Sequence, residues 1–127
     1  MLNSKITKGN LNILVIRFYT KVTKDDLIGP IFKDILGDDL KNETWKAHTQ
    51  LLTDFWASIA LGDFAYDSSP FAPHVKFSHR LSREAFERWL KLFLETLNTV
   101  YEPNIAKLFH ERGLRIAGNF MRNLNID

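Results

Sequence analysis

Residues 45–59 read WKAHTQLLTDFWASI, and the spacing within this stretch decides the fold class. Its large side chains recur at steps of three and four residues, which is the period of one face of an α-helix. The positions on that face, one of them a histidine, are Trp45, His48, Leu52, Phe55, Trp56 and Ile59. Gly62 follows, in the place where a glycine commonly ends a helix. The stretch therefore predicts a long amphipathic helix that ends near Gly62.

The same period recurs in three other stretches, and no stretch gives a convincing strand signal. The apolar positions are Leu11, Leu14, Val15, Phe18, Tyr19 and Val22; then Phe86, Trp89, Leu90, Phe93, Leu97, Val100 and Tyr101; then Ile105, Leu108, Phe109, Ile116 and Phe120. A tight connection near Glu102 predicts that the last two helices form an antiparallel hairpin. Gly113 and Gly118 predict some irregularity in the last helix. We therefore expect residues 1–127 to form a single all-α domain of four long helices and shorter pieces.

Composition and charge exclude several classes of function. The formal net charge is +2, from 17 basic and 15 acidic side chains that are interspersed along the chain, whereas nucleic-acid binding needs a concentrated basic patch. No apolar run approaches the roughly 20 residues that span a bilayer. The chain has no cysteine, which excludes disulfides and thiolate ligands and fits a reducing compartment. We expect a cytoplasmic protein, monomeric by default, that binds neither nucleic acid nor membrane.

Aromatic side chains are numerous, at 10 Phe, 3 Trp and 3 Tyr. Such a surplus fits either a tightly packed small core or a pocket for a flat apolar ligand. Three amphipathic groups that can donate a hydrogen bond, Tyr19, His48 and Trp89, also lie on the apolar faces. Taken alone, His48 is more simply a structural or half-exposed histidine than a ligand, so both interpretations stay open.

Other kinds of site find little support in the sequence. His74 and His79 are five residues apart, a poor spacing for two ligands on one helix face, and no HExxH zinc pattern is present. No glycine-rich phosphate loop and no nucleophile elbow occurs. The acidic pairs at 25–26 and 38–39 are best interpreted as solvated turns, because adjacent side chains point in different directions.

Four features, taken in order and spacing, resemble a known family. They are Phe18-Tyr19, Gly-Pro-Ile-Phe at 29–32, Trp-Lys-Ala-His at 45–48 followed by Phe55-Trp56, and a lone His74 ahead of FERWLKLF at 86–93. Together they resemble the truncated globins, most closely the third group of that family, which occurs in bacteria. The resemblance covers nearly the whole chain from about Leu11. It implies a two-over-two helical sandwich around haem b, which is iron protoporphyrin IX.

The resemblance also implies residue roles. His74 matches the proximal histidine that binds the iron, and Phe32 matches the phenylalanine that packs on the haem face. Tyr19 and Trp89 match residues that hydrogen-bond a bound gas, and His48 matches a distal histidine typical of the third group. Leu52 matches the apolar residue one turn beyond that histidine.

The remaining cofactor contacts follow from what haem needs, an apolar slot with a few placed polar groups. The lining expected in full is Phe18, Phe32, Leu52, Phe55, Trp56, His74, Lys76, Phe77, His79, Arg80, Phe86, Trp89 and Phe93. Among these, Lys76, His79 and Arg80 are candidates for the charged haem propionates. Each of the three is equally well explained as an ordinary solvated residue.

The resemblance, together with the residues that match it, predicts a haem protein that binds a diatomic gas: oxygen, and also NO or CO. One alternative is a haem enzyme that turns over nitric oxide or peroxide and needs an external, unidentified reductase, because the chain has no room for a flavin domain. A second alternative, of another class, is a haem-free helical domain that binds a protein partner.

Overall fold

Five helices make up the fold of the computed structural model, which describes residues 1–62, 74 and 78–126. They are α1 (Lys8–Thr23), α2 (Gly29–Leu36), α3 (Glu43–Leu61), α4 (Arg83–Val100) and α5 (Pro103–Asn123). The described residues contain no strand, only an isolated bridge between Asn3 and Tyr101. The prediction of four long helices with a shorter piece is therefore confirmed. The loop expected at 63–71 lies outside the described residues.

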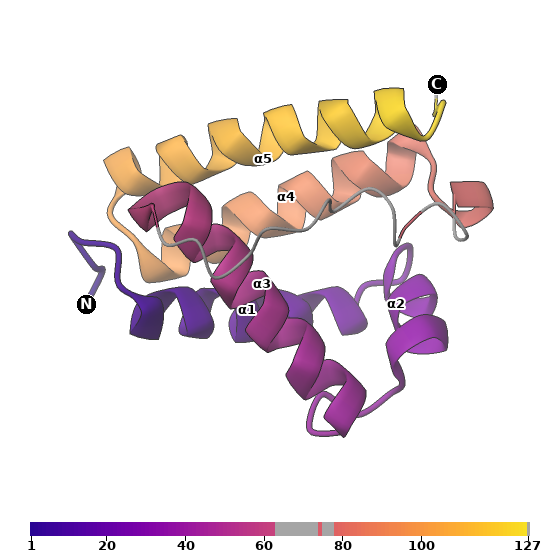
Figure 1. Cartoon of the computed structure of the whole chain (residues 1–127), viewed down its shortest axis with the longest axis horizontal. Helices are drawn as coiled ribbons and strands as arrows, with labels where there is room; N and C mark the ends of the chain where they lie inside the picture. The colour runs from indigo at the N-terminus through magenta and orange to yellow at the C-terminus, as the bar shows by residue number, and fades with distance from the viewer. Residues whose placement is uncertain (63–73, 75–77, 127) are drawn as a thin grey trace.

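The helices form two packed pairs (Figure 1). In one pair α3 crosses α1, and in the other α4 and α5 run antiparallel as a hairpin, as predicted. Contacts between α1 and α4 join the two pairs, while the short α2 packs mainly on α1. This arrangement is the two-over-two helical sandwich that the sequence led us to expect.

Local sequence explains where the helices begin and end. Thr7 forms a capping box with Asn10 at the start of α1. The side chains of Asn42 and Ser82 each accept a backbone N–H group in the first turn of α3 and α4, from Trp45 and Ala85. Gly62 ends α3 in the left-handed conformation, with φ of 70°, which glycine adopts without strain.

The corner between α1 and α2 depends on Gly29 and Asp25. A Cβ on Gly29 would lie 2.9 Å from a carbonyl oxygen near the end of α1, so only glycine allows this approach. One carboxylate oxygen of Asp25 accepts the backbone N–H groups of Leu27 and Ile28. The other accepts Arg88 Nη1 at 2.7 Å and so ties this corner to α4.

The predicted apolar faces differ in how completely protein covers them. All six predicted positions of α1 are buried, but on α3 and α4 the face divides into two parts. Trp45, Trp56, Phe93 and Leu97 are buried, whereas a second set is only partly covered: His48, Leu52, Phe55, Phe86 and Trp89. All five residues of the second set line a cavity, to which the buried Trp56 and Phe93 also contribute.

Two expectations about α5 are wrong. The helix is continuous through Gly113 and Gly118, because Gly113 is packed tightly against α4 and Gly118 is simply tolerated. Leu108 was expected on the inner face but is 60% exposed, since Ile105 and Phe109 take the positions that face the core.

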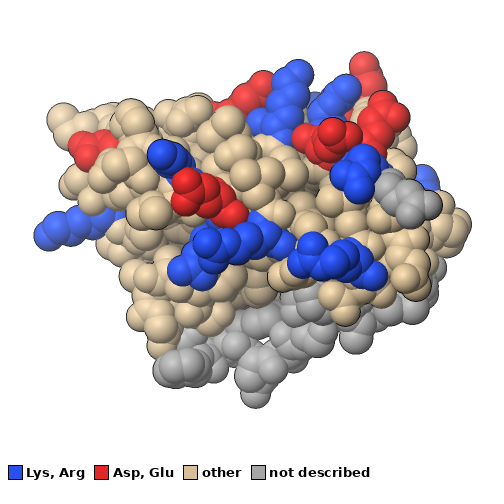
Figure 2. All heavy atoms as spheres, turned by 90° about the horizontal axis from the view of Figure 1, so that it is seen from above, with Lys and Arg blue, Asp and Glu red and all other residues tan. Residues whose placement is uncertain are grey.

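The outer surface carries charges of both signs. In the face seen in Figure 2, basic and acidic side chains lie next to one another between broad uncharged areas. Within the described part of the chain, no helix is both long and apolar enough to cross a bilayer.

Candidate functional site

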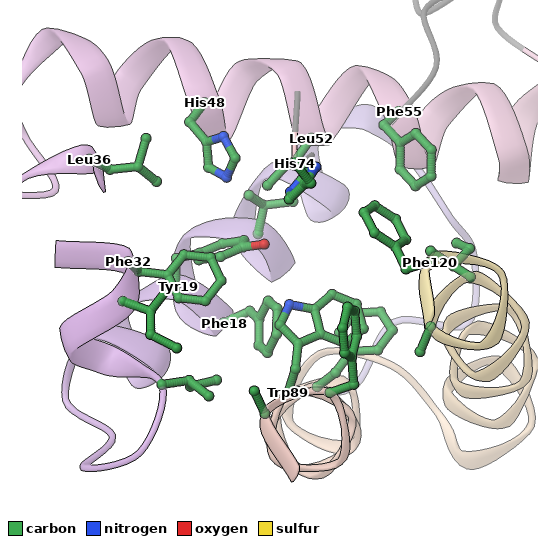
Figure 3. Close-up of a pocket in the computed structure, with 18 of the residues that line it drawn as sticks. Phe18, Tyr19, Phe32, Leu36, His48, Leu52, Phe55, His74, Trp89 and Phe120 are labelled. Atoms are coloured by element: carbon green, nitrogen blue, oxygen red, sulfur yellow. The ribbon is translucent and has the colours of Figure 1, made fainter. Parts of the chain in front are cut away.

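A cavity of about 400 Å³ lies between the two helix pairs, and all five helices contribute to its wall. The lining is almost entirely aliphatic and aromatic. Figure 3 shows His48, Leu52 and Phe55 on the α3 side, Trp89 across from them, and Phe120 from α5 at one end. Apolar walls with a few polar groups are typical of small-molecule and cofactor sites.

Most of the predicted site residues meet in this cavity. The described ones that line it are Phe18, Tyr19, Phe32, His48, Leu52, Phe55, Trp56, His74, Phe86, Trp89 and Phe93. His79 and Arg80 do not line it, and Lys76 and Phe77 lie outside the described residues. The lining expected from the sequence did not include some residues that line the cavity, among them Leu36, Leu51, Leu81 and Phe120. Phe120 could have been found, because it belongs to the predicted inner face of the last helix.

His74 places an imidazole at the cavity wall from the segment that joins α3 and α4. It is half-buried. Its ring meets the ring of Phe120 edge to face, with centroids 4.9 Å apart. Within the described residues, no cluster of three His, Asp or Glu side chains could hold a metal ion by itself.

Tyr19 projects its hydroxyl group into the cavity from a buried position on α1 (Figure 3). Its ring is surrounded by aromatic neighbours, with Phe18 at 4.8 Å and Phe32, Trp45 and His48 each at 5.5 Å between centroids. Burial raises the pKa of Tyr19 to about 12, although the nearby Trp89 side chain acts in the opposite direction. The phenol therefore keeps its proton at neutral pH.

Trp89 and Tyr19 both line the cavity and bring different polar groups to it. An indole N–H donates and cannot accept, whereas a phenol hydroxyl can do either. A group inside the cavity could therefore receive a hydrogen bond from either side chain.

His48 is the other polar group on this side of the cavity. Its Nε2 is buried and has no hydrogen-bond partner among the described residues. Burial, and to a smaller extent the neighbouring His74, lower the pKa of His48 to about 4, so the imidazole is neutral at neutral pH. A buried polar atom without a partner is costly. This nitrogen therefore indicates that the cavity is built for a ligand.

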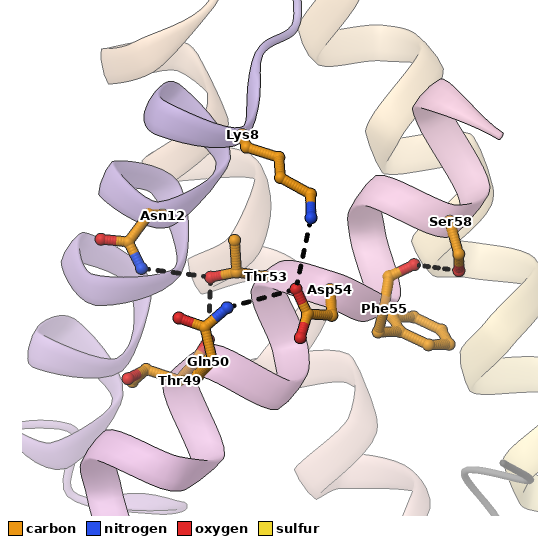
Figure 4. Close-up of polar contacts among 8 residues, drawn as sticks. All are labelled: Lys8, Asn12, Thr49, Gln50, Thr53, Asp54, Phe55 and Ser58. Carbon is orange, nitrogen blue, oxygen red and sulfur yellow. Dashed lines mark hydrogen bonds and ion pairs between the residues drawn. The ribbon is translucent and has the colours of Figure 1, made fainter. Parts of the chain in front are cut away.

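The face of α3 that meets α1 carries polar contacts that hold the helix over α1 (Figure 4). Lys8 Nζ lies 3.8 Å from Asp54 Oδ1, which also accepts Gln50 Nε2 at 3.2 Å. Asn12 Nδ2 donates to the buried Thr53 hydroxyl at 3.2 Å. With this face fixed to α1, the face that carries His48, Leu52 and Phe55 is left toward the cavity.

Comparison with known proteins supports the assignment of this fold. No family model matches the chain. A curated relative, the group 3 truncated haemoglobin of Campylobacter jejuni, is 38% identical over 107 residues, which cover 84% of this chain and 82% of the relative. The chain belongs to group 3 of the truncated haemoglobin family.

A solved structure agrees with this membership. The crystal structure of a group III truncated haemoglobin from Campylobacter jejuni matches with a TM-score of 0.85 and 35% identity, over 98% of this chain and 95% of that one. This truncated haemoglobin is thus a globin-type haem protein with the all-α fold of its family.

The cavity of this truncated haemoglobin has the character that haem requires. The group is a flat apolar disc whose iron needs an imidazole, and here an apolar cavity carries the imidazole of His74 on its wall. Leu51 lines the same cavity yet is 48% exposed, which an apolar ligand at the edge would explain. The orphaned Nε2 of His48 is a second sign that a ligand completes the site.

Proposed function

We propose that this truncated haemoglobin, as one domain over residues 1–127, holds haem b in the cavity through His74 and binds a diatomic gas such as oxygen, NO or CO. When bound, the haem supplies the iron at which such a gas coordinates. The observation that carries the proposal is the convergence of the His74 imidazole and three hydrogen-bonding groups in one apolar cavity.

The roles of the chain's own residues follow from their chemistry. His74 supplies a neutral imidazole nitrogen, while Phe32, Leu52 and Phe120 supply apolar surface for the flat faces of the group. Aromatic and aliphatic walls also keep water away from the polar groups, which strengthens every hydrogen bond formed inside.

Tyr19, Trp89 and His48 form the polar side of the cavity. The Tyr19 hydroxyl and the Trp89 N–H are both hydrogen-bond donors on the cavity wall, and either can donate to the gas. Neutral His48 can donate or accept through its orphaned Nε2, depending on its tautomer. Donors fixed in a dry pocket stabilise a ligand that carries partial negative charge, so we expect slow release of oxygen.

The alternative of a haem-free interaction domain fits the cavity poorly. A chain that works without a cofactor gains nothing from a cavity of about 400 Å³ and a buried, unsatisfied imidazole nitrogen. Cavities of that kind lower stability by the contacts that they forgo.

A titration of the purified chain with haemin tests the proposal. Trp56 and Trp89 line the cavity, so bound haem is expected to quench tryptophan fluorescence and to reach saturation at one haem per chain. Fluorescence that stays unquenched by haemin would overturn the proposal. A matched titration of His110→Ala, a residue outside the cavity lining, is expected to follow the wild type.

A further inference from the structure

Phe93 on α4 is the most tightly enclosed ring beside the cavity. It is 1% exposed. The indoles of Trp89 and Trp56 both stack on it, with centroids at 5.0 Å and 5.2 Å and interplanar angles of 29° and 24°. Phe18 adds a tilted contact at 5.3 Å. The position of the Phe93 ring therefore determines the positions of the two indoles that stack on it.

Gly113 on α5 provides the space that Phe93 occupies. A Cβ on Gly113 would lie 3.2 Å from both Cδ2 and Cε2 of the Phe93 ring, and 3.5 Å from Leu90 Cδ2. Contacts at 3.2 Å are tighter than ordinary van der Waals packing, so the ring would have to move by a few tenths of an ångström. A glycine within a helix lowers helix stability, and here it allows the close approach of α5 to α4.

The indole of Trp89 is held from two directions. Its face lies against Phe93, and its edge meets the ring of Phe18 at 86° with centroids 5.1 Å apart. The same indole lines the cavity, as Tyr19 does. A rotation of the indole therefore changes where its N–H donor lies on the polar side of the cavity.

We propose that Gly113 is a positioning residue for the polar side of the cavity. By leaving room for Phe93, it sets the tilt of the Trp89 indole and so the place of the Trp89 N–H on that side of the cavity. This inference rests on the proposed function, because it gives Trp89 and Tyr19 their roles toward a gas ligand. It adds Gly113 of α5, which does not line the cavity and acts on Trp89 only through the ring of Phe93.

Gly113→Ala tests the inference, and Gly118→Ala is its matched control. Both changes replace a glycine of α5 by alanine and give the same gain in helix propensity. Only the first meets an aromatic ring, because the nearest atom to a Cβ on Gly118 is the guanidinium nitrogen of Arg122 at 3.6 Å. The readouts are the ¹H–¹⁵N resonance of the Trp89 indole, the C–O stretching frequency of the carbon monoxide complex, and the rate of oxygen dissociation.

We expect Gly113→Ala to shift the indole resonance and the C–O stretch, and to speed oxygen dissociation by about 2- to 10-fold, as for a weakened hydrogen bond. Gly118→Ala is expected to change none of the three. In a Phe93→Leu chain, Gly113→Ala should shift the indole no further, because the ring that it displaces is gone. Equal behaviour of the two alanine variants would overturn the inference.

Two further measurements keep the test decisive. If Gly113→Ala does not fold, Phe93→Leu alone is expected to move the Trp89 indole resonance, and an unmoved resonance would contradict the inference. If the wild type takes up no haem, the proposed function fails, yet the indole comparison in the same chains still decides whether Gly113 sets the position of Trp89.

Discussion

Arg80 Nη1 lies 2.8 Å from Asp34 Oδ2, and this ion pair joins the turn that follows His74 to helix α2. Both partners flank the cavity without lining it. Helix α2 packs mainly on α1. The ion pair gives α2 a second attachment, to the turn that follows His74 in the chain.

Breaking this attachment should weaken the hold on haem. For Asp34→Asn we expect haem to be lost to an excess of a haem-free acceptor globin a few-fold faster, since a partly exposed ion pair contributes about 0–1 kcal/mol. Glu43→Gln removes another exposed pair, with Lys46, and should leave the rate unchanged. Slower haem loss in Asp34→Asn would instead indicate that Arg80, once released, serves a haem propionate.

The Asp25–Arg88 contact predicts how stability depends on pH. Burial alone would raise the pKa of Asp25, but the hydrogen bonds from the backbone N–H groups of Ile28 and Leu27 and from Arg88 outweigh it, so the pKa is lowered. A carboxyl group with a lowered folded-state pKa stabilises the fold above its unfolded value of about 3.9. That contribution is lost as the pH falls through the folded-state value.

Asp25→Asn should therefore destabilise the protein at neutral pH but not in acid. We expect a loss of about 1.5–3 kcal/mol at neutral pH, typical of a hydrogen bond to a charged group, which shrinks toward zero as the pH falls through the lowered folded-state pKa. Urea unfolding at a series of pH values measures both. A loss that is the same at every pH would contradict the assigned role of the carboxylate charge.

Gly29→Ala should destabilise the corner between α1 and α2. The added Cβ would meet backbone oxygens at 2.9 Å and 3.0 Å, which cannot rotate away as a side chain would, so we expect a cost of about 1–3 kcal/mol. Gly9→Ala is the control, because its Cβ would meet only Thr7 Oγ1 at 3.7 Å. Thermal unfolding of the two variants should differ clearly, and equal midpoints would show that the corner relaxes freely.

Tyr19→Phe and Trp89→Phe should each speed oxygen dissociation by about 2- to 10-fold, the effect of one lost hydrogen bond. Because Phe18 contacts both rings, the two changes should not add, and the double variant should fall short of the product of the single effects. Stopped-flow measurement of oxygen release gives all four rates. Unchanged rates in both single variants would remove the donor role.

The fold could be predicted from the sequence because the helical period is strong and because the residues that begin or end the helices are recognisable by their chemistry. Ser82, Gly62 and Pro103 mark helix ends through capping and backbone geometry, and each lies where the structure ends or begins a helix. The period was less reliable for α5, where Leu108 satisfies the spacing yet is exposed. Which of several neighbouring apolar positions turns inward depends on the rotation of the helix against its partner, and the sequence of one helix does not contain that angle.

The candidate site was predictable in its centre and less so at its rim. Tyr19, His48 and Trp89 were conspicuous as polar groups on apolar faces, and they share the cavity. The pairing of Arg80 with Asp34 was not predictable, since it joins residues 46 positions apart. The space that Gly113 leaves for Phe93 was not predictable either. From the sequence alone, a glycine within a helix predicts irregularity, and its role in close packing can be recognised only when its neighbour on another helix is known.

The central claim, that His74 holds a gas-binding haem, is tested most directly by the visible absorption spectrum of the reduced protein before and after carbon monoxide. Wild type should show a Soret band that shifts on addition of the gas, and His74→Ala should lose or badly alter this band. The control is His79→Ala, which changes an exposed histidine outside the cavity lining. This control should retain both the band and its shift. A wild-type Soret band and shift that persist unchanged in His74→Ala would contradict the account.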